Sequence, residues 1–362
     1  MKMPRLAYLY IVAFACLVVF AGLEAAGKQE YSGLLLSAFF LCLSVAFRGN
    51  KMLKGISFTA VILSLVSLAL FYPSSFRVIG GLQTPALIIP AMQVIMFGMG
   101  TELSLKDFAD VLRMPKAVLI GLVCHYTIMP FVGFLIARVF AFPPEVAAGI
   151  ILIGCCPSGL ASNVMCFLAR ANLALSVTIT AMSTLAAPLL TPALMKWLAG
   201  NYVTVDFWAM AWHITEIVIL PVVAGLLFHY LVRGKFKWLD QAMPYLSMIG
   251  IAMVLVIITA DKSSALKEVG LLLLLATTLH NLGGYFLGYW SARLLRFPEK
   301  DARTIAIEVG MQNAGLAAGL AKAMGTLMAG LAPAVFGVVM NITGSSLANW
   351  WHHKNPDESS QT

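Results

Sequence analysis

Apolar residues fill long runs of this chain, and short polar stretches separate the runs. A helix needs about 20 consecutive, mostly apolar residues to cross the hydrocarbon core of a bilayer. Twelve runs approach or exceed that length, at 6–23, 32–48, 56–72, 84–101, 117–140, 146–169, 173–198, 207–231, 243–260, 269–295, 303–329 and 332–351. The pattern therefore predicts an all-α polytopic membrane protein.

Two of the predicted spans contain glycine, proline and polar residues near their middle. The first interruption, GCCPSGLASN, runs from Gly154 to Asn163, and the second, EVGMQNAGLA, runs from Glu308 to Ala317. Pro157 has no N–H for a regular helix, and the glycines of both segments permit unwinding. Unwound backbone occurs at membrane depth only where protein or a water-filled cavity surrounds it. The two segments are therefore predicted to lie inside the protein.

The interruptions fall at matching places once the first two spans are set aside. Ten spans remain, and each interruption lies in the fourth span of a set of five. Because five is odd, the second set enters the membrane inverted relative to the first, which is the plan of many secondary transporters. We predict two additional N-terminal transmembrane helices in 1–52, a first inverted repeat in 53–200, a second in 201–352, and a polar cytoplasmic tail in 353–362.

The composition supports a membrane protein, and the charges add an orientation. Hydrophobic residues make up 60% of the chain and charged residues 11%, whereas soluble domains carry about 25% charged residues. If the N-terminus is cytoplasmic, 17 of the 24 Lys and Arg lie on the cytoplasmic side and 7 on the other, as the positive-inside rule favours. The net charge of +8 is therefore assigned to cytoplasmic loops rather than to nucleic-acid binding. Both termini are predicted to be cytoplasmic, with a bacterial inner membrane as the expected location.

The first span admits an alternative interpretation. Lys2 and Arg5 precede its apolar run, and Ala25 and Ala26 follow it, which is also the pattern of a cleaved signal peptide. Removal of that segment would leave eleven spans and would not change the topology of the others.

Oxygen-bearing side chains gather in and beside both interruptions. A carboxylate such as Glu308 is costly near the bilayer centre unless its charge is compensated, and a bound cation compensates it. Hard cations prefer oxygen ligands, and unwound helices supply them in transporters. Besides Glu308, the candidate ligands are Ser162, Asn163, Ser176, Thr180, Gln312 and Asn313. Ser176 and Thr180 share one helix face, but hydroxyls in spans also bond their own backbone, and both interpretations stay open.

Other polar residues within spans are weaker candidates. We expect His280 and Asn281 to form helix–helix hydrogen bonds rather than to line a cavity. His213 and Glu216, three positions apart, are expected at the outer membrane interface. The six cysteines lie in apolar runs without a metal-like spacing, and we expect small buried side chains there.

Six stretches of the sequence together resemble the bile acid:sodium symporter family, particularly its bacterial members. They are IMFGMGTEL (95–103), GCCPSGLASNVM (154–165), LALSVTIT (173–180), LTPAL (190–194), IEVGMQNAGLA (307–317) and NITGSSLA (341–348). The resemblance covers about residues 56–352. It implies a ten-helix core divided into a panel domain and a core domain, with two discontinuous helices that cross in the core domain. Two sodium ions would bind near the crossing, and an organic anion would bind in the cleft between the domains. That anion would be bile-acid-like or a small carboxylate such as pantoate.

The resemblance also implies roles for individual residues. One sodium ion would be bound by Ser162, Asn163, Ser176, Thr180 and Glu308. The other would be bound by Glu308, Gln312 and the backbone carbonyl groups of Val309 and Met311. Asn313 and Asn341 would face the substrate.

Three positions depart from the pattern of that family. His125 stands where bacterial relatives carry a glutamine that ligates the second sodium ion, and an imidazole nitrogen is a poorer sodium ligand than an amide oxygen. Leu160 replaces a threonine beside the expected substrate, and Met340 replaces a histidine before Asn341. The first departure weakens the expected second sodium site, and the other two predict a more apolar substrate pocket.

The sequence is thus interpreted as a sodium-coupled symporter of an organic anion that works by alternating access, and not as an enzyme. The alternative within transport is a proton-coupled organic anion carrier or a sodium/proton antiporter of a related crossover fold. No span contains the adjacent Asp-Asp or Asn-Asp pair that would favour the antiporter. The HExxH motif of a metalloprotease is also missing from the sequence.

Overall fold

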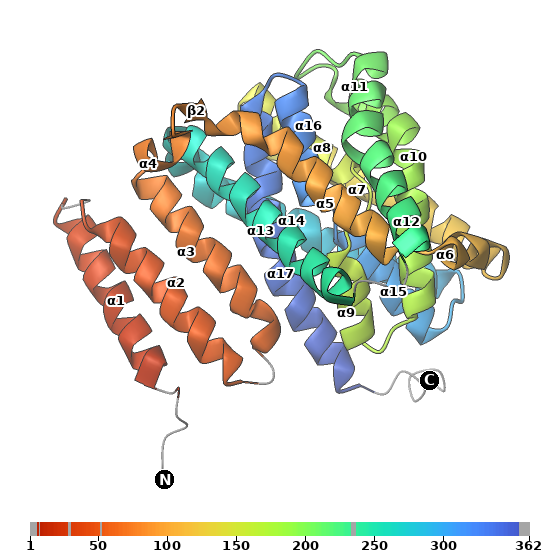
Figure 1. The fold of residues 1–362 in the computed structure, drawn as a ribbon, viewed down its shortest axis with the longest axis horizontal. Helices are drawn as coiled ribbons and strands as arrows, with labels where there is room; N and C mark the ends of the chain where they lie inside the picture. The colour runs from red at the N-terminus through yellow and green to blue at the C-terminus, as the bar shows by residue number, and fades with distance from the viewer. Residues whose placement is uncertain (1–5, 7, 28–29, 51–52, 233–236, 355–362) are drawn as a thin grey trace, which may run out of the picture. The chain divides into compact units, whose positions relative to one another are not determined.

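The computed structural model describes residues 6, 8–27, 30–50, 53–232 and 237–354, and it is almost entirely helical (Figure 1). The helices are α1 (Tyr8–Ala25), α2 (Ser32–Arg48), η1 (Lys54–Ile56), α3 (Ser57–Phe71), α4 (Ser74–Arg77), η2 (Thr84–Leu87), α5 (Ile88–Glu102), α6 (Leu105–Ala109), η3 (Asp110–Leu112), α7 (Pro115–Phe140), α8 (Pro144–Cys155), α9 (Ala161–Leu168), α10 (Leu173–Ala199), α11 (Phe207–Ile214), η4 (Thr215–Ile219), α12 (Leu220–Val232), α13 (Lys237–Asp261), α14 (Ser263–Leu294), α15 (Glu299–Gly310), α16 (Ala314–Ala323), η5 (Leu327–Gly330) and α17 (Leu331–His352). Within the described residues, seven helical stretches are long and apolar enough to cross a membrane, and shorter apolar helices accompany them. The prediction of an all-α polytopic membrane protein is confirmed.

The predicted spans agree with these helices except at some ends. α7 and α10 begin and end within two residues of the predicted bounds. The largest differences are at α13 and α14, which begin at Lys237 and Ser263 rather than at residues 243 and 269. Polar residues prolong these helices beyond the apolar run that marks the membrane. The predicted polar tail lies outside the described residues from residue 355 onward.

One predicted span, 207–231, is not a uniform α-helix. α11 and α12 are joined by a π-helical turn, η4 (Thr215–Ile219). Pro221 lies two residues after this turn and has no N–H for the carbonyl group four residues earlier. A π-turn widens the helix by one residue, and we attribute it here to that missing hydrogen bond.

A small hairpin that the sequence pattern did not predict follows α4. Its strands β1 (Val78–Ile79) and β2 (Leu82–Gln83) pair antiparallel, with the first residue of one opposite the last residue of the other. Gly80 and Gly81 form the turn with φ of 58° and 84°. Two-residue hairpin turns of this kind need left-handed backbone at both central positions, which glycine adopts readily.

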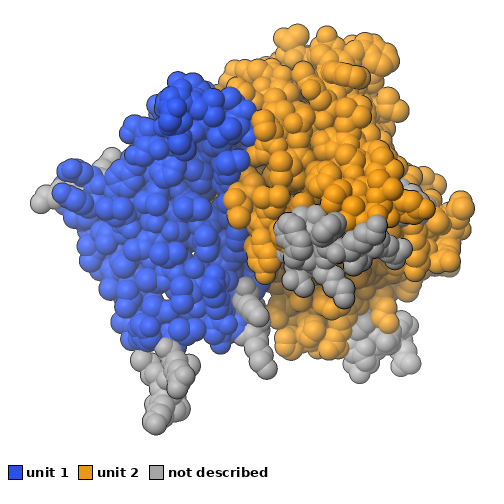
Figure 2. All heavy atoms as spheres, in the orientation of Figure 1, with its two compact units in different colours: residues 1–87, 252–270 blue, residues 88–251, 271–362 orange. Residues whose placement is uncertain are grey.

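The chain divides into two compact units, coloured separately in Figure 2. Unit 1 consists of residues 1–87 and 252–270, and in it α2 packs against both α1 and α3. Unit 2 consists of residues 88–251 and 271–362 and contains both interrupted helices. These units are defined by contacts and do not test the predicted inverted repeats, which stay a prediction.

The half-helices that precede the two interruptions, α8 and α15, are buried within unit 2. Every residue from Val146 to Cys155 and from Ala302 to Gly310 is buried. α8 is apolar on all sides, as expected of a helix that protein surrounds. α15 instead carries buried Glu299, Arg303 and Glu308, so its charges need partners inside the protein.

Arg303 and Glu299 are partners of each other at the start of α15. The Nε of Arg303 donates to the carboxylate of Glu299 over 2.8 Å, and its Nη1 donates to the carbonyl oxygens of Ala169 and Trp351, each over 3.2 Å. The hydroxyl of Tyr289 also donates to Glu299 over 2.8 Å. This network ties the first turns of α15 to the ends of α9 and α17, and thereby fixes the position of the later turns.

Candidate functional site

The two interruptions bond to each other. Ser158 and Gln312, in the unwound segments, form an antiparallel β-bridge. The N–H of Asn313 donates to the carbonyl oxygen of Pro157 over 2.9 Å. A Cβ on Gly159 would lie 3.0 Å from the carbonyl oxygen of Gln312, so glycine permits this close approach. Both predicted interruptions are therefore confirmed, and they meet in one place.

Glu308 lies in the last turn of α15, beside this meeting point, and is 0% exposed. The hydroxyl of Ser176 donates to its Oε1 over 2.5 Å, and the hydroxyl of Thr180 donates to its Oε2 over 2.9 Å. Ser176 and Thr180 are one turn apart on α10, so both reach the same carboxylate. The sequence left open whether these hydroxyls bond their own backbone, and the structure directs both to Glu308.

Asn163, from α9, adds a further oxygen to this group. Its Oδ1 lies 2.8 Å from the Ser176 hydroxyl and 3.4 Å from the Thr180 hydroxyl. Each hydroxyl has a single proton, so Ser176 cannot donate to Asn163 and to Glu308 at once. The group therefore holds more oxygen lone pairs than protons. Among the described residues Glu308 forms no ion pair, and a carboxylate buried in this way is costly in its charged form unless a cation lies beside it.

Ser162 borders the same group. Its hydroxyl donates to the carbonyl oxygen of Gly159 over 2.8 Å and lies 3.4 Å from the Thr180 hydroxyl. All five residues expected around the first sodium ion therefore lie together, namely Ser162, Asn163, Ser176, Thr180 and Glu308. We refer to them as the carboxylate cluster.

The backbone groups expected around a second sodium ion also lie nearby, but protein donors already reach them. The side-chain Nε2 of Gln312 donates to the carbonyl oxygen of Val309 over 2.7 Å. The hydroxyl of Ser158 donates to the carbonyl oxygen of Met311 over 3.1 Å. The Oε1 of Gln312 is buried without a hydrogen-bond partner.

His125, on α7, is fully buried beside both interruptions. Its Nδ1 lies 3.0 Å from the carbonyl oxygen of Glu308, and its Nε2 lies 2.9 Å from the carbonyl oxygen of Cys156. Which nitrogen donates depends on the tautomer. The ring thus connects the C-terminal ends of α8 and α15, where helices leave carbonyl groups without an intrahelical donor.

The four residues expected to face the substrate are Leu160, Asn313, Met340 and Asn341. Asn313 caps α16, because its Oδ1 accepts the N–H of Leu316 over 3.0 Å. The Nδ2 of Asn341 donates to the carbonyl oxygen of Gly337 in its own helix over 2.7 Å. In the described part of the chain no hydrogen bond joins the four residues to one another, so a common substrate pocket stays a prediction.

α14 carries two adjacent polar residues that bond to neighbouring helices, and one of them contacts the end of α15 at the second interruption. The Nδ2 of Asn281 donates to the carbonyl oxygen of Gly310 over 2.8 Å, and its Oδ1 accepts the hydroxyl of Thr343 over 2.5 Å. The Nε2 of His280 lies 2.9 Å from the carbonyl oxygen of Met129. The predicted helix–helix hydrogen bonds are confirmed.

Sequence reasoning missed two contributions to this site. Asn281 serves a carbonyl group at the end of α15, a partner that only the fold reveals. Ser158 bridges to the second interruption. Its position inside GCCPSGLASN was the available signal, since polar groups in an unwound segment face other protein groups rather than lipid.

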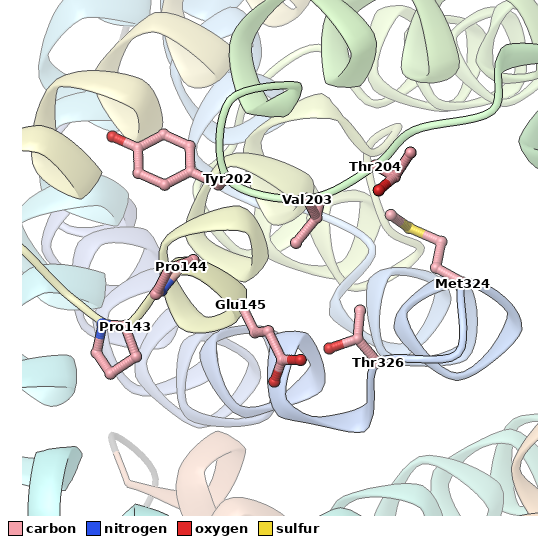
Figure 3. A pocket seen from close by; sticks show the side chains of 8 residues that line it. All are labelled: Pro143, Pro144, Glu145, Tyr202, Val203, Thr204, Met324 and Thr326. Carbon is pink, nitrogen blue, oxygen red and sulfur yellow. The ribbon is translucent and has the colours of Figure 1, made fainter.

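A cavity of about 620 Å³ opens among the loops of unit 2 (Figure 3). It is lined by Pro143, Pro144 and Glu145 at the start of α8, Tyr202, Val203 and Thr204 between α10 and α11, and Met324 and Thr326 after α16. None of the predicted ligands lines it. In the predicted orientation these loops lie on the outer side of the membrane.

Comparison with known proteins shows similarity to sodium-dependent transporters. A family model described as the sodium bile acid symporter family matches residues 89–269. The chain is 42% identical over 261 residues to the uncharacterized sodium-dependent transporter YocS of Bacillus subtilis. The matched region covers 72% of this chain and 81% of that protein. It is 36% identical over 292 residues to the probable sodium/metabolite cotransporter BASS1, chloroplastic, of Arabidopsis thaliana. The matched region covers 80% of this chain and 72% of that protein.

Apolar helices of membrane-spanning length, together with two interrupted helices that meet beside a buried carboxylate, are features of an integral membrane transporter, and the relatives are transporters rather than enzymes. The chain belongs to the sodium bile acid symporter family. The resemblance predicted from the six sequence stretches is confirmed.

Proposed function

We propose that this protein couples the inward movement of sodium to the uptake of an organic anion by alternating access. The observation that carries the proposal is the buried carboxylate of Glu308, which lies among hydroxyl and amide oxygens where the two interruptions meet. The names of the relatives, a sodium-dependent transporter and sodium/metabolite cotransporters, support the same ion.

Sodium is a transported substrate in this proposal, and the carboxylate cluster is its site. A carboxylate inside the protein pays a desolvation cost that an adjacent cation offsets. The donor set of Glu308, Asn163, Ser176 and Thr180 consists of oxygens, which suits a hard cation. Because the ion stabilises the arrangement in which α9, α10 and α15 meet, its binding shifts the protein towards that conformation.

The interruptions also supply groups that suit an anion. α9 and α16 begin at the meeting point, and the N-terminal end of a helix carries a partial positive charge. Transporters aim such ends at carboxylates of their substrates. We propose that the organic anion contacts Leu160, Asn313, Met340 and Asn341. The apolar Leu160 and Met340 favour an anion with a substantial hydrocarbon part.

A correspondence between the two predicted repeats supports the inverted architecture. Ser158 and Gln312 pair with each other. The carbonyl groups two residues earlier, those of Cys156 and Gly310, are each reached by a side chain from the third span of the respective repeat, His125 on α7 and Asn281 on α14. Two such halves around one site can expose it alternately to either side by rocking against each other.

The location follows from the same proposal. We propose a bacterial inner membrane with both termini in the cytoplasm, because that orientation places most Lys and Arg on the cytoplasmic side. The two N-terminal helices of 1–52 are additional to the ten-helix transport core, and we assign them no role in transport.

The proposal is tested in two steps. A thermal-unfolding screen of carboxylates, with sodium chloride or N-methylglucamine chloride, identifies anions that stabilise the protein, because ligands that bind the native state raise its apparent stability. Uptake of such an anion is then measured in proteoliposomes with an inward sodium gradient or an inward proton gradient. We expect uptake to follow the sodium gradient. Uptake that follows only the proton gradient would contradict the proposal and favour a proton-coupled carrier.

A further inference from the structure

The carboxylate cluster and the expected second sodium site differ in the hydrogen bonds that their oxygens accept. A hard cation needs several oxygen lone pairs directed at one point. Around Glu308, Asn163 Oδ1 and both carboxylate oxygens lie within hydrogen-bond distance of the hydroxyls of Ser176 and Thr180, which have one proton each. That surplus of acceptors leaves a place for one ion.

The backbone oxygens of the expected second site already accept hydrogen bonds from protein donors. The carbonyl oxygen of Val309 accepts the amide N–H of Gln312, and the carbonyl oxygen of Met311 accepts the hydroxyl of Ser158. Protein donors therefore already use one lone pair on each of two backbone oxygens that the ion would need. The Oε1 of Gln312 is left without a partner, and a single amide oxygen does not make a coordination shell.

His125 takes up the remaining room. Both of its ring nitrogens lie within hydrogen-bond distance of carbonyl oxygens, those of Glu308 at 3.0 Å and Cys156 at 2.9 Å. These spacings leave no gap for an ion between the ring and either oxygen. The nitrogen that donates its N–H offers no lone pair to a cation, and the other ring nitrogen is too close to its carbonyl oxygen for an ion to lie between them. The ring thus does not serve as the ligand that a side-chain amide oxygen would be at this position.

The ring instead links the two half-helices directly. Cys156 follows the last residue of α8, and Glu308 belongs to the last turn of α15. An ion between these ends would hold them together by attracting the carbonyl oxygens of both. His125 contacts the same two oxygens from α7, as Asn281 contacts the carbonyl oxygen of Gly310 from α14.

We propose that this transporter binds one sodium ion, in the carboxylate cluster, and that His125 occupies the place of a second. The proposal rests on sodium coupling as proposed above and specifies its stoichiometry. For a substrate with one negative charge, it makes each transport step electroneutral.

The test is equilibrium binding of radioactive sodium to the purified full-length protein in detergent. We expect about one ion per chain with a Hill coefficient near one. About two ions per chain would overturn this inference and leave sodium coupling intact. No specific sodium binding at all would instead contradict the proposed function.

Two variants make the assignment to His125 sharper. His125→Gln replaces the ring with an amide oxygen, and we expect it to bind about two ions per chain with a Hill coefficient above one. His229→Gln, on the half-buried surface of α12, is the matched control and is expected to stay at about one ion. If His125→Gln is folded by size-exclusion chromatography and still binds one ion, His125 is not the occupant of a second site.

Discussion

Thr180 donates a hydrogen bond to Glu308 over 2.9 Å, although 128 positions separate the two residues in the chain. One lies on α10, which follows the first interruption, and the other lies at the end of α15, just before the second. The bond therefore joins the two predicted repeats at the carboxylate that we propose as the sodium site. Its removal tests whether the hydroxyls matter for ion binding.

Thr180→Val keeps the shape of the side chain and removes the hydroxyl. We expect the apparent affinity for sodium to fall about tenfold, which corresponds to about 1.4 kcal/mol and lies within reach of a hydrogen bond to a charged group. Sodium titrations monitored by thermal unfolding measure the effect. Thr184→Val, one turn further along α10, removes a hydroxyl that donates to the backbone of Thr180 and should leave sodium affinity within about twofold. Equal losses in both variants would contradict a direct role for Thr180.

Two adjacent glycines of α14 make a matched pair for the close packing against the second interruption. A Cβ on Gly284 would lie 2.9 Å from the Cα of Gly310, whereas a Cβ on Gly283 would meet only Val132, at 3.5 Å. We expect Gly284→Ala to destabilise the protein by about 1–3 kcal/mol through overpacking. Gly283→Ala should be neutral or slightly stabilising, because alanine favours helices over glycine by about 0.5–1 kcal/mol. Thermal unfolding of both variants in the same detergent checks the difference.

Asn281 satisfies a carbonyl group at the end of α15. Asn281→Ala leaves the buried carbonyl oxygen of Gly310 and the hydroxyl of Thr343 without this partner, and we expect a loss of about 1–3 kcal/mol in stability. Asn349→Ala, at a half-buried position of α17, is the control and should change the unfolding temperature little. An Asn281→Ala protein as stable as the control would show that the bond to α15 is dispensable.

Arg303 and Glu299 form a buried ion pair in which the side chains are 1% and 5% exposed. Arg303→Met leaves Glu299 without its main partner, and breaking a buried pair from one side typically costs about 3–5 kcal/mol. Arg113→Met breaks a pair whose arginine side chain is 71% exposed, and such surface pairs contribute about 0–1 kcal/mol. We therefore expect a large fall in unfolding temperature for the first variant and a small one for the second. Similar effects would contradict the anchoring role of Arg303.

The sequence was sufficient to predict the spans and both interruptions, and it led to the proposal that Glu308 is part of an ion site. Runs of apolar residues predict the segments that cross the membrane. Pro157 and its neighbouring glycines predict an unwound segment. An acidic residue with no clear basic partner near the middle of a span indicates an ion site, because an uncompensated charge there is costly.

Pairing across the fold could not be predicted in the same way. Nothing in the sequence pattern states that Ser158 bridges to Gln312, or that Asn281 serves the end of α15. Those contacts depend on how the helices pack, whereas the hydropathy pattern predicts only which segments lie in the membrane. The π-turn before Pro221 was also missed, since a proline within a span indicates a missing hydrogen bond but not the kind of turn that accommodates it.

Thermal unfolding of the wild type and of Glu308→Gln, in sodium chloride and in N-methylglucamine chloride at equal ionic strength, tests the central claim most directly. Sodium at a hundredfold excess over its dissociation constant should stabilise the wild type by about 2.7 kcal/mol. It should not stabilise Glu308→Gln, whose neutral amide keeps the shape of the side chain without the charge. Glu145→Gln, an exposed glutamate at the start of α8, should respond to sodium like the wild type. An equal sodium response in Glu308→Gln, or none in the wild type, would contradict the account.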